Sequence, residues 1–172
     1  MKQKLALTAA LIASLTLMPS CDDSNDNNGF TQLPTATYTG NTDMTIMNMN
    51  FTTPDTVSVM MDSNAQYAKM SFTSRTVTVA AAGNLVFNIG PFAIDSIEVS
   101  KQGDTYILSR PNAFATQATV AMGAQQPSSK TLTGRLGDCS ISSNNASIKL
   151  NDLMIGTMPS SLSFDFNGTK AD

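Results

Sequence analysis

The sequence predicts an all-β domain that closes into a barrel or a sandwich. The chain of 172 residues is rich in β-branched residues and in Asn, Ser and Gly, which suit strands and turns. Short runs alternate apolar and polar residues, and Gly, Pro, Asn or Asp separates most of them. No stretch keeps a helical period of 3.6 residues beyond one turn. Eight or more strands at this spacing favour closure, because an open sheet leaves unpaired edges.

The expected strands follow one another through residues 35–172, which form one domain. The first spans residues 37–51 if it continues past a bulge, and it places Tyr38, Thr42, Met44 and Ile46 on one face. Further strands are expected at 56–61, 67–72, 77–81, 85–89, 92–99, 105–109, 115–122, 131–136, 147–150 and 162–166.

Residues 1–20 have the pattern of a signal peptide. Lys2 and Lys4 form a positive region, and residues 5–17 form an apolar region too short to span a bilayer as a helix. The stretch before Cys21 resembles a lipobox, which implies that Cys21 carries palmitate and other acyl chains and becomes the first residue of the mature protein. Two or more acyl chains anchor a protein stably. The alternative is an ordinary secretory signal followed by an unrelated cysteine.

Residues 21–34 are expected to be a flexible acidic tether, because their first half has no apolar residue to bury. The Asp and Asn residues there lack the Gly and Glu of a calcium loop. An acidic tract directly after a lipidated Cys is similar to the export signal of Bacteroides-type lipoproteins. This similarity implies that Asp22, Asp23 and Asp26 direct the protein to the outer face of the outer membrane, at the cell surface.

Four stretches resemble the calycin-like β-barrel lipoproteins of Bacteroides-type bacteria: YTGNTDMTI, FAIDSIEV, KTLTGRLGDCSI and SLSFDFNGTK. Most of the match lies in the opening Tyr38-x-Gly40 and in the closing FNGTK at residues 166–170. The resemblance implies an antiparallel, closed, lipocalin-like barrel of about eight strands whose interior can hold one small apolar ligand. Members of the family mostly lack an assigned activity.

An eight-stranded barrel is either filled by its own side chains or holds one small ligand. Two functions therefore stay open: a binding module for a small apolar molecule, or a structural or interaction module that contacts another envelope component or a host surface. Flexible Met side chains suit either a cavity or a core. The residues expected to line a cavity are Met44, Ile46, Met60, Met70, Phe92, Phe164 and Phe166.

Composition argues against catalysis and against nucleic acid. The chain has no His, and it contains neither a nucleophile motif nor a phosphate-binding motif. Asp95 and Glu98 are the nearest carboxylate pair, but three positions along one strand should send them to opposite faces. The net charge of -3 offers no basic patch for phosphates. We therefore expect no enzyme, no cofactor and no metal.

Two smaller features concern single residues. Cys139 has no cysteine partner once Cys21 is acylated, and it is expected to be a small buried apolar residue. The tripeptides Asp-Thr-Val and Asp-Ser-Ile resemble acceptor sites of Bacteroides-type O-glycosylation, so Thr56 and Ser96 are candidate acceptors.

Overall fold

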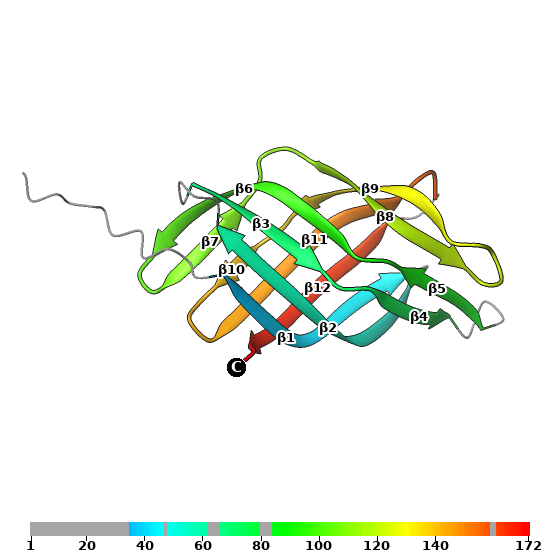
Figure 1. Cartoon of the computed structure of the whole chain (residues 1–172), viewed down its shortest axis with the longest axis horizontal. Coiled ribbons are helices and arrows are strands. Elements are labelled where there is room, and N and C mark those ends of the chain that lie inside the picture. The colour runs from blue at the N-terminus through cyan, green and yellow to red at the C-terminus, as the bar shows by residue number, and fades with distance from the viewer. Residues whose placement is uncertain (1–34, 47, 62–65, 80–83, 159–160) are drawn as a thin grey trace, which may run out of the picture.

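The computed structural model describes residues 35–46, 48–61, 66–79, 84–158 and 161–172 (Figure 1). These residues form twelve strands in one antiparallel sheet and no helix, which confirms the all-β prediction. The predicted signal peptide and the whole of the predicted tether lie outside the described residues. Within the described part of the chain, no helix could cross a membrane.

The strands succeed one another along the chain with short connections. They are β1 (Ala36–Ile46), β2 (Met49–Met61), β3 (Tyr67–Phe72), β4 (Arg75–Val79), β5 (Leu85–Ile89), β6 (Phe92–Gln102), β7 (Thr105–Ser109), β8 (Phe114–Met122), β9 (Ser128–Leu136), β10 (Cys139–Ile141), β11 (Asn145–Ile155) and β12 (Leu162–Lys170).

Eight strands form a ring in the order β10-β7-β6-β3-β2-β1-β12-β11, because β10 also pairs with β11. The strands β9, β8, β5 and β4 continue the sheet from β11. In Figure 1, β7 and β10 lie at one end of the elongated molecule, while β4 and β5 lie at the other. The long strands β1, β2, β11 and β12 connect the two ends.

The expected single strand at 37–51 is two strands in the structure. β1 ends at Ile46, and β2 begins at Met49 and runs back antiparallel to it. Asn48 has a φ of 62°, a left-handed conformation that Asn tolerates better than most residues. The prediction of a bulge here was wrong, because the alternation of Met and polar residues runs through the turn without a Gly or Pro to mark it.

A bulge in β6 changes which side chains face outward. Ser96 has a φ of 58°, and the register between β3 and β6 shifts beside it. The additional residue lets Ile94 and Ile97 both point into the core, although they are three positions apart. Asp95 and Glu98 are consequently both exposed on the outer face. The expectation that they face opposite sides was wrong.

The opening and closing sequence motifs meet where β1 pairs with β12. Gly40 lies directly opposite Gly168 in this pairing. A Cβ atom on Gly40 would collide with the backbone of Asn167 and Gly168, and one on Gly168 would collide with the Phe166 ring. Because both residues lack a Cβ, the two backbones approach closely and the ring lies against the glycine. The motifs therefore serve the β1–β12 pairing that completes the ring.

All twelve strands contribute to one continuous apolar core. The four residues of β1 predicted to share a face, Tyr38, Thr42, Met44 and Ile46, are at most 2% exposed. The inward side chains of the ring and those of β4, β5, β8 and β9 belong to the same cluster. The core therefore extends from one end of the molecule to the other.

Candidate functional site

Six of the seven predicted cavity residues are buried. Met44, Ile46, Met70, Phe92, Phe164 and Phe166 are each at most 5% exposed and belong to the core. Phe72, which the sequence did not single out, stacks on Phe92 with ring centres 4.6 Å apart. It also meets Phe164 edge-on at 5.3 Å. At this level the interior is occupied by side chains that pack against one another.

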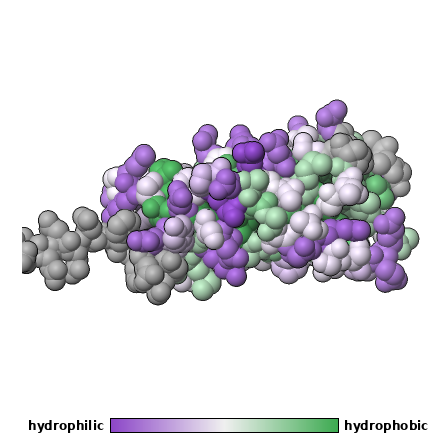
Figure 2. Space-filling model, turned by 90° about the horizontal axis from the view of Figure 1, so that it is seen from above, coloured by the Kyte–Doolittle hydropathy of each residue, from purple (hydrophilic) through white to green (hydrophobic). Residues whose placement is uncertain are grey.

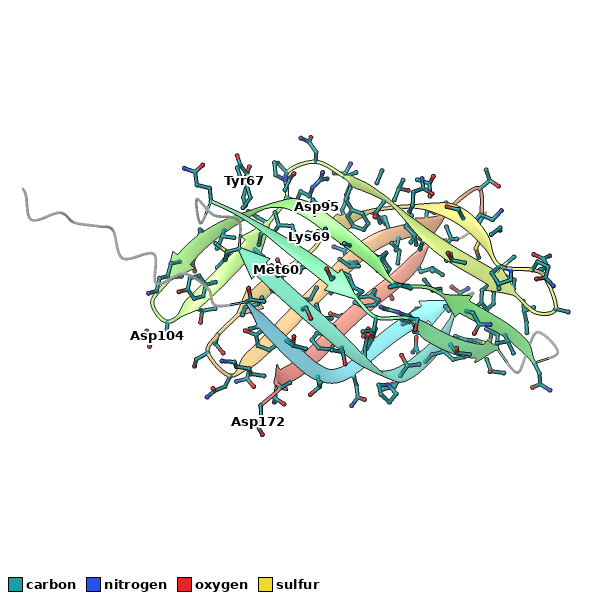
Figure 3. All side chains as sticks on the ribbon, viewed as in Figure 1. Met60, Tyr67, Lys69, Asp95, Asp104 and Asp172 are labelled. Carbon is teal, nitrogen blue, oxygen red and sulfur yellow. The ribbon has the colours of Figure 1, made fainter. Side chains whose placement is uncertain are left out.

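The seventh residue, Met60, contradicts the prediction because its side chain is 48% exposed. Val57 and Val59 point inward, so the period of two along β2 turns Met60 outward. Counting from these valines would have placed Met60 correctly. In Figure 3, Met60, Tyr67, Lys69 and Asp95 lie in one region of the outer surface formed by β2, β3 and β6.

Asp55 in β2 and Arg75 in β4 form an ion pair within the core. Their Oδ2 and Nη1 atoms are 3.1 Å apart, and the two side chains are at most 1% exposed. The Asp55 carboxylate accepts hydrogen bonds from Thr42 Oγ1 at 2.8 Å, Thr73 Oγ1 at 2.9 Å and the Thr56 backbone N–H at 2.8 Å. These donors stabilise the buried negative charge.

The Arg75 guanidinium lies among aromatic rings. Its central carbon is 4.6 Å from the Phe164 ring centre, 5.4 Å from that of Phe92 and 5.8 Å from that of Phe72. Nη2 donates to the Thr73 carbonyl at 3.0 Å. Burial lowers the pKa of Arg75, and the Asp55 carboxylate opposes that shift. The pair joins β2 to β4, which are not neighbours in the sheet order.

Cys139 is 2% exposed, as its predicted burial requires. Its Sγ accepts a hydrogen bond from the Lys149 N–H at 3.3 Å and donates to the Lys149 carbonyl at 3.4 Å. Burial raises the pKa of the thiol to about 11. Because the thiolate is the reactive form, Cys139 is inert at neutral pH.

Two of the carboxylates are held in ion pairs. The exposed Asp95 lies 3.5 Å from Lys69 Nζ, and Asp55 is fully engaged with its partners. Among the residues that the structure describes, no three His, Cys, Asp or Glu side chains form a group able to hold a metal ion. What the geometry offers is a packed interior and a polar exterior. In Figure 2, hydrophilic and hydrophobic residues are interspersed over the visible face.

The outer face of β7, β10, β11 and β12 contains a polar hollow that the sequence did not predict. It is open to solvent and has a volume of about 460 Å³. Its floor includes Gly168 and Ala146. The polar side chains around it, which define the polar hollow, are Thr105, Ser140, Ser142, Asn145, Ser147, Asn167 and Thr169. The sequence contained a clue to this hollow. The outward residues of β10, β11 and β12 that border it are all Ser, Thr or Asn.

The two glycosylation-like tripeptides differ in their structural setting. The Asp55 carboxylate before Thr56 is buried in the ion pair, and Thr56 itself is partly buried. Asp95 and Ser96 are both exposed at the bulge of β6. Of the two candidate acceptors, Ser96 is therefore the more accessible.

No protein-family model, curated protein or solved structure matches the chain. The fold described above defines an all-β protein with a ring of eight strands and one continuous apolar core. The calycin-like resemblance of the sequence stays a prediction.

Proposed function

We propose that this protein is a non-catalytic interaction module of the bacterial envelope, which is anchored to the outer membrane through Cys21 and works through its outer surface. The filled interior carries this proposal. Six residues expected to line a ligand cavity belong to one buried apolar cluster, and Phe72 packs against two of them, Phe92 and Phe164. If no ligand enters the interior, the outer surface is the part of the molecule that can bind a partner.

The buried ion pair strengthens this argument. Arg75, which is paired with Asp55, lies among the same aromatic rings that a ligand would have to contact. An apolar ligand that displaced these side chains would separate two paired charges, at a large cost in free energy. The hypothesis of a small apolar ligand therefore needs a rearrangement of the core, whereas an interaction at the outer surface needs none.

We also propose that the fold is a closed calycin-like barrel. The ring of eight strands and the pairing of Gly40 with Gly168 support it. Interruptions between β3 and β4, β5 and β6, β7 and β8, and β9 and β10 divide what would be continuous barrel strands. On this interpretation the twelve strands are segments of about eight long ones.

The anchor is tested by replacing each cysteine in turn. We expect Cys21→Ala to abolish palmitate incorporation and to move the protein from the membrane to the soluble fraction, because the acyl chains supply the membrane affinity. Cys139→Ala removes the other thiol and should leave the protein membrane-bound. Membrane retention of the Cys21→Ala protein would overturn the proposed anchor.

Surface exposure has its own test. Replacing Asp22, Asp23 and Asp26 with Ala should leave acylation intact but protect the protein from protease added to intact cells. The wild-type protein should be cleaved under the same conditions. Equal cleavage of both proteins would remove the export role proposed for these residues.

A further inference from the structure

Some polar side chains on the outer surface are hydrogen-bonded to one another. Across several strand pairs, a hydroxyl or amide group on one strand bonds its neighbour on the next. These pairs are Thr37 with Ser58 at 3.0 Å, Thr45 with Asn50 at 2.8 Å, Thr76 with Asn88 at 2.7 Å and Gln117 with Thr131 at 2.9 Å. Such groups satisfy each other and present little unused hydrogen-bonding capacity.

The polar hollow differs from this pattern. Ser140 lies opposite Ser147, Ser147 opposite Asn167, and Asn145 opposite Thr169. In the described part of the chain, no side-chain hydrogen bond joins any of these opposed pairs. Ser140 and Ser147 are partly buried residues whose hydroxyl oxygens remain accessible to solvent. A ligand that hydrogen-bonds them would satisfy groups that the protein leaves open.

Two small residues, Gly168 and Ala146, border the hollow. They lie opposite each other in the β11–β12 pairing and face the core, because Ala146 is 3% exposed and a Cβ on Gly168 would collide with the Phe166 ring, so the hollow lies over their backbone. The ring of Phe166 lies against Gly168 from the core side. The volume of about 460 Å³ falls within the range of small-molecule sites, roughly 300–1,000 Å³.

The charge of the hollow selects the class of ligand. None of its lining side chains is charged. The next pair along the same strands is Lys149 and Asp165, whose Nζ and Oδ2 atoms are 3.7 Å apart and whose charges offset each other. A charged ligand would lose hydration without meeting an opposite charge. Hydroxyl and amide groups, which both donate and accept, match a neutral ligand that carries many hydroxyl groups.

We propose that the polar hollow binds a neutral saccharide. Ser140, Ser147 and Asn167 bond the sugar hydroxyls, while Asn145 and Thr169 bond them at the rim. This inference rests on the proposed function, in which a partner binds the outer surface, and it names the chemical class of that partner. It does not depend on the lipid anchor. Because the hollow is open and has no aromatic lining residue, we expect an affinity in the roughly millimolar range.

The test is saturation-transfer difference NMR on the full chain purified in detergent. The panel contains maltohexaose, cellohexaose, mannohexaose and xylohexaose as neutral probes, and a hyaluronate hexasaccharide as the anionic one. The double variant Ser147→Ala/Asn167→Ala removes two groups from the hollow. The matched control Asn88→Ala/Ser129→Ala makes the same changes on β5 and β9, outside it. Circular dichroism confirms that each variant is folded.

We expect at least one neutral hexasaccharide to bind, with affinity reduced at least about fivefold in the hollow variant and unchanged in the control. The inference is overturned if no neutral probe binds, if the hyaluronate binds equally well, or if both variants bind alike. Any of these results leaves the outer-surface proposal standing. That proposal fails separately if an apolar molecule is found inside the protein.

Discussion

Asp55 and Arg75 are the residues whose roles depend most on their surroundings. A charge whose partner is removed from a buried pair is left uncompensated, so Asp55→Ala should lower the free energy of unfolding by about 3–5 kcal/mol. The variant Asp55→Leu/Arg75→Met should recover most of this loss because no isolated charge remains. Asp165→Ala, which removes the exposed partner of Lys149, should cost about 0–1 kcal/mol. Urea denaturation measures all three, and an equal cost for Asp55→Ala and Asp165→Ala would contradict the account.

Cys139 makes stability depend on pH in the alkaline range. Burial raises the pKa of its thiol from an ordinary value of 9.0 to about 11, so the unfolded chain loses this proton first as pH rises. The folded state then binds more protons, and stability should fall between about pH 9 and pH 11 by on the order of 2 kcal/mol. Tyr38, whose pKa burial also raises, acts in the same direction.

The Cys139→Ala variant separates these two contributions. Its free energy of unfolding, measured in urea at several pH values, should decline less steeply above pH 9 than that of the wild type. Part of the remaining slope should come from Tyr38, whose pKa burial raises. Parallel curves for the two proteins would show that the thiol is not protected by burial.

At the scale of the strands, Gly40 tests whether the β1–β12 pairing needs a missing Cβ. In Gly40→Ala the new methyl group would meet backbone atoms of β12, which cannot move aside as a side chain can. We expect a loss of roughly 2–4 kcal/mol in the free energy of unfolding. Gly103→Ala is the control: its Cβ meets nothing within 4 Å, and its φ of 60° should cost about 1–2 kcal/mol. A smaller loss for Gly40→Ala than for Gly103→Ala would contradict this role.

The strands were largely predictable because alternation of apolar and polar residues reports burial directly. The sequence did not reveal the positions where the alternation is interrupted by a bulge or a turn. The bulge at Ser96 and the turn at Asn48 both use a left-handed residue other than Gly, so no conspicuous marker identifies them. The short strand β10 was not predicted for a different reason, because three residues are too few to show a period of two.

The candidate site was less predictable than the fold. The buried Asp55 lies two positions before Val57 on the inward face of β2, so periodicity could have found it, but its partner Arg75 lies beyond the next strand. The polar hollow required knowledge of which strands are neighbours across the ring. Residues 140, 147 and 167 are brought together by pairings that no local sequence pattern specifies.

For the whole molecule, the central claim is that the protein's own side chains fill the interior and that partners meet the outer surface. Native mass spectrometry of the full protein, extracted from its own membrane in a mild detergent, tests this claim most directly. We predict the mass of an acylated chain that begins at Cys21, with no apolar molecule retained. A stoichiometric apolar molecule that is released only on denaturation would contradict the account.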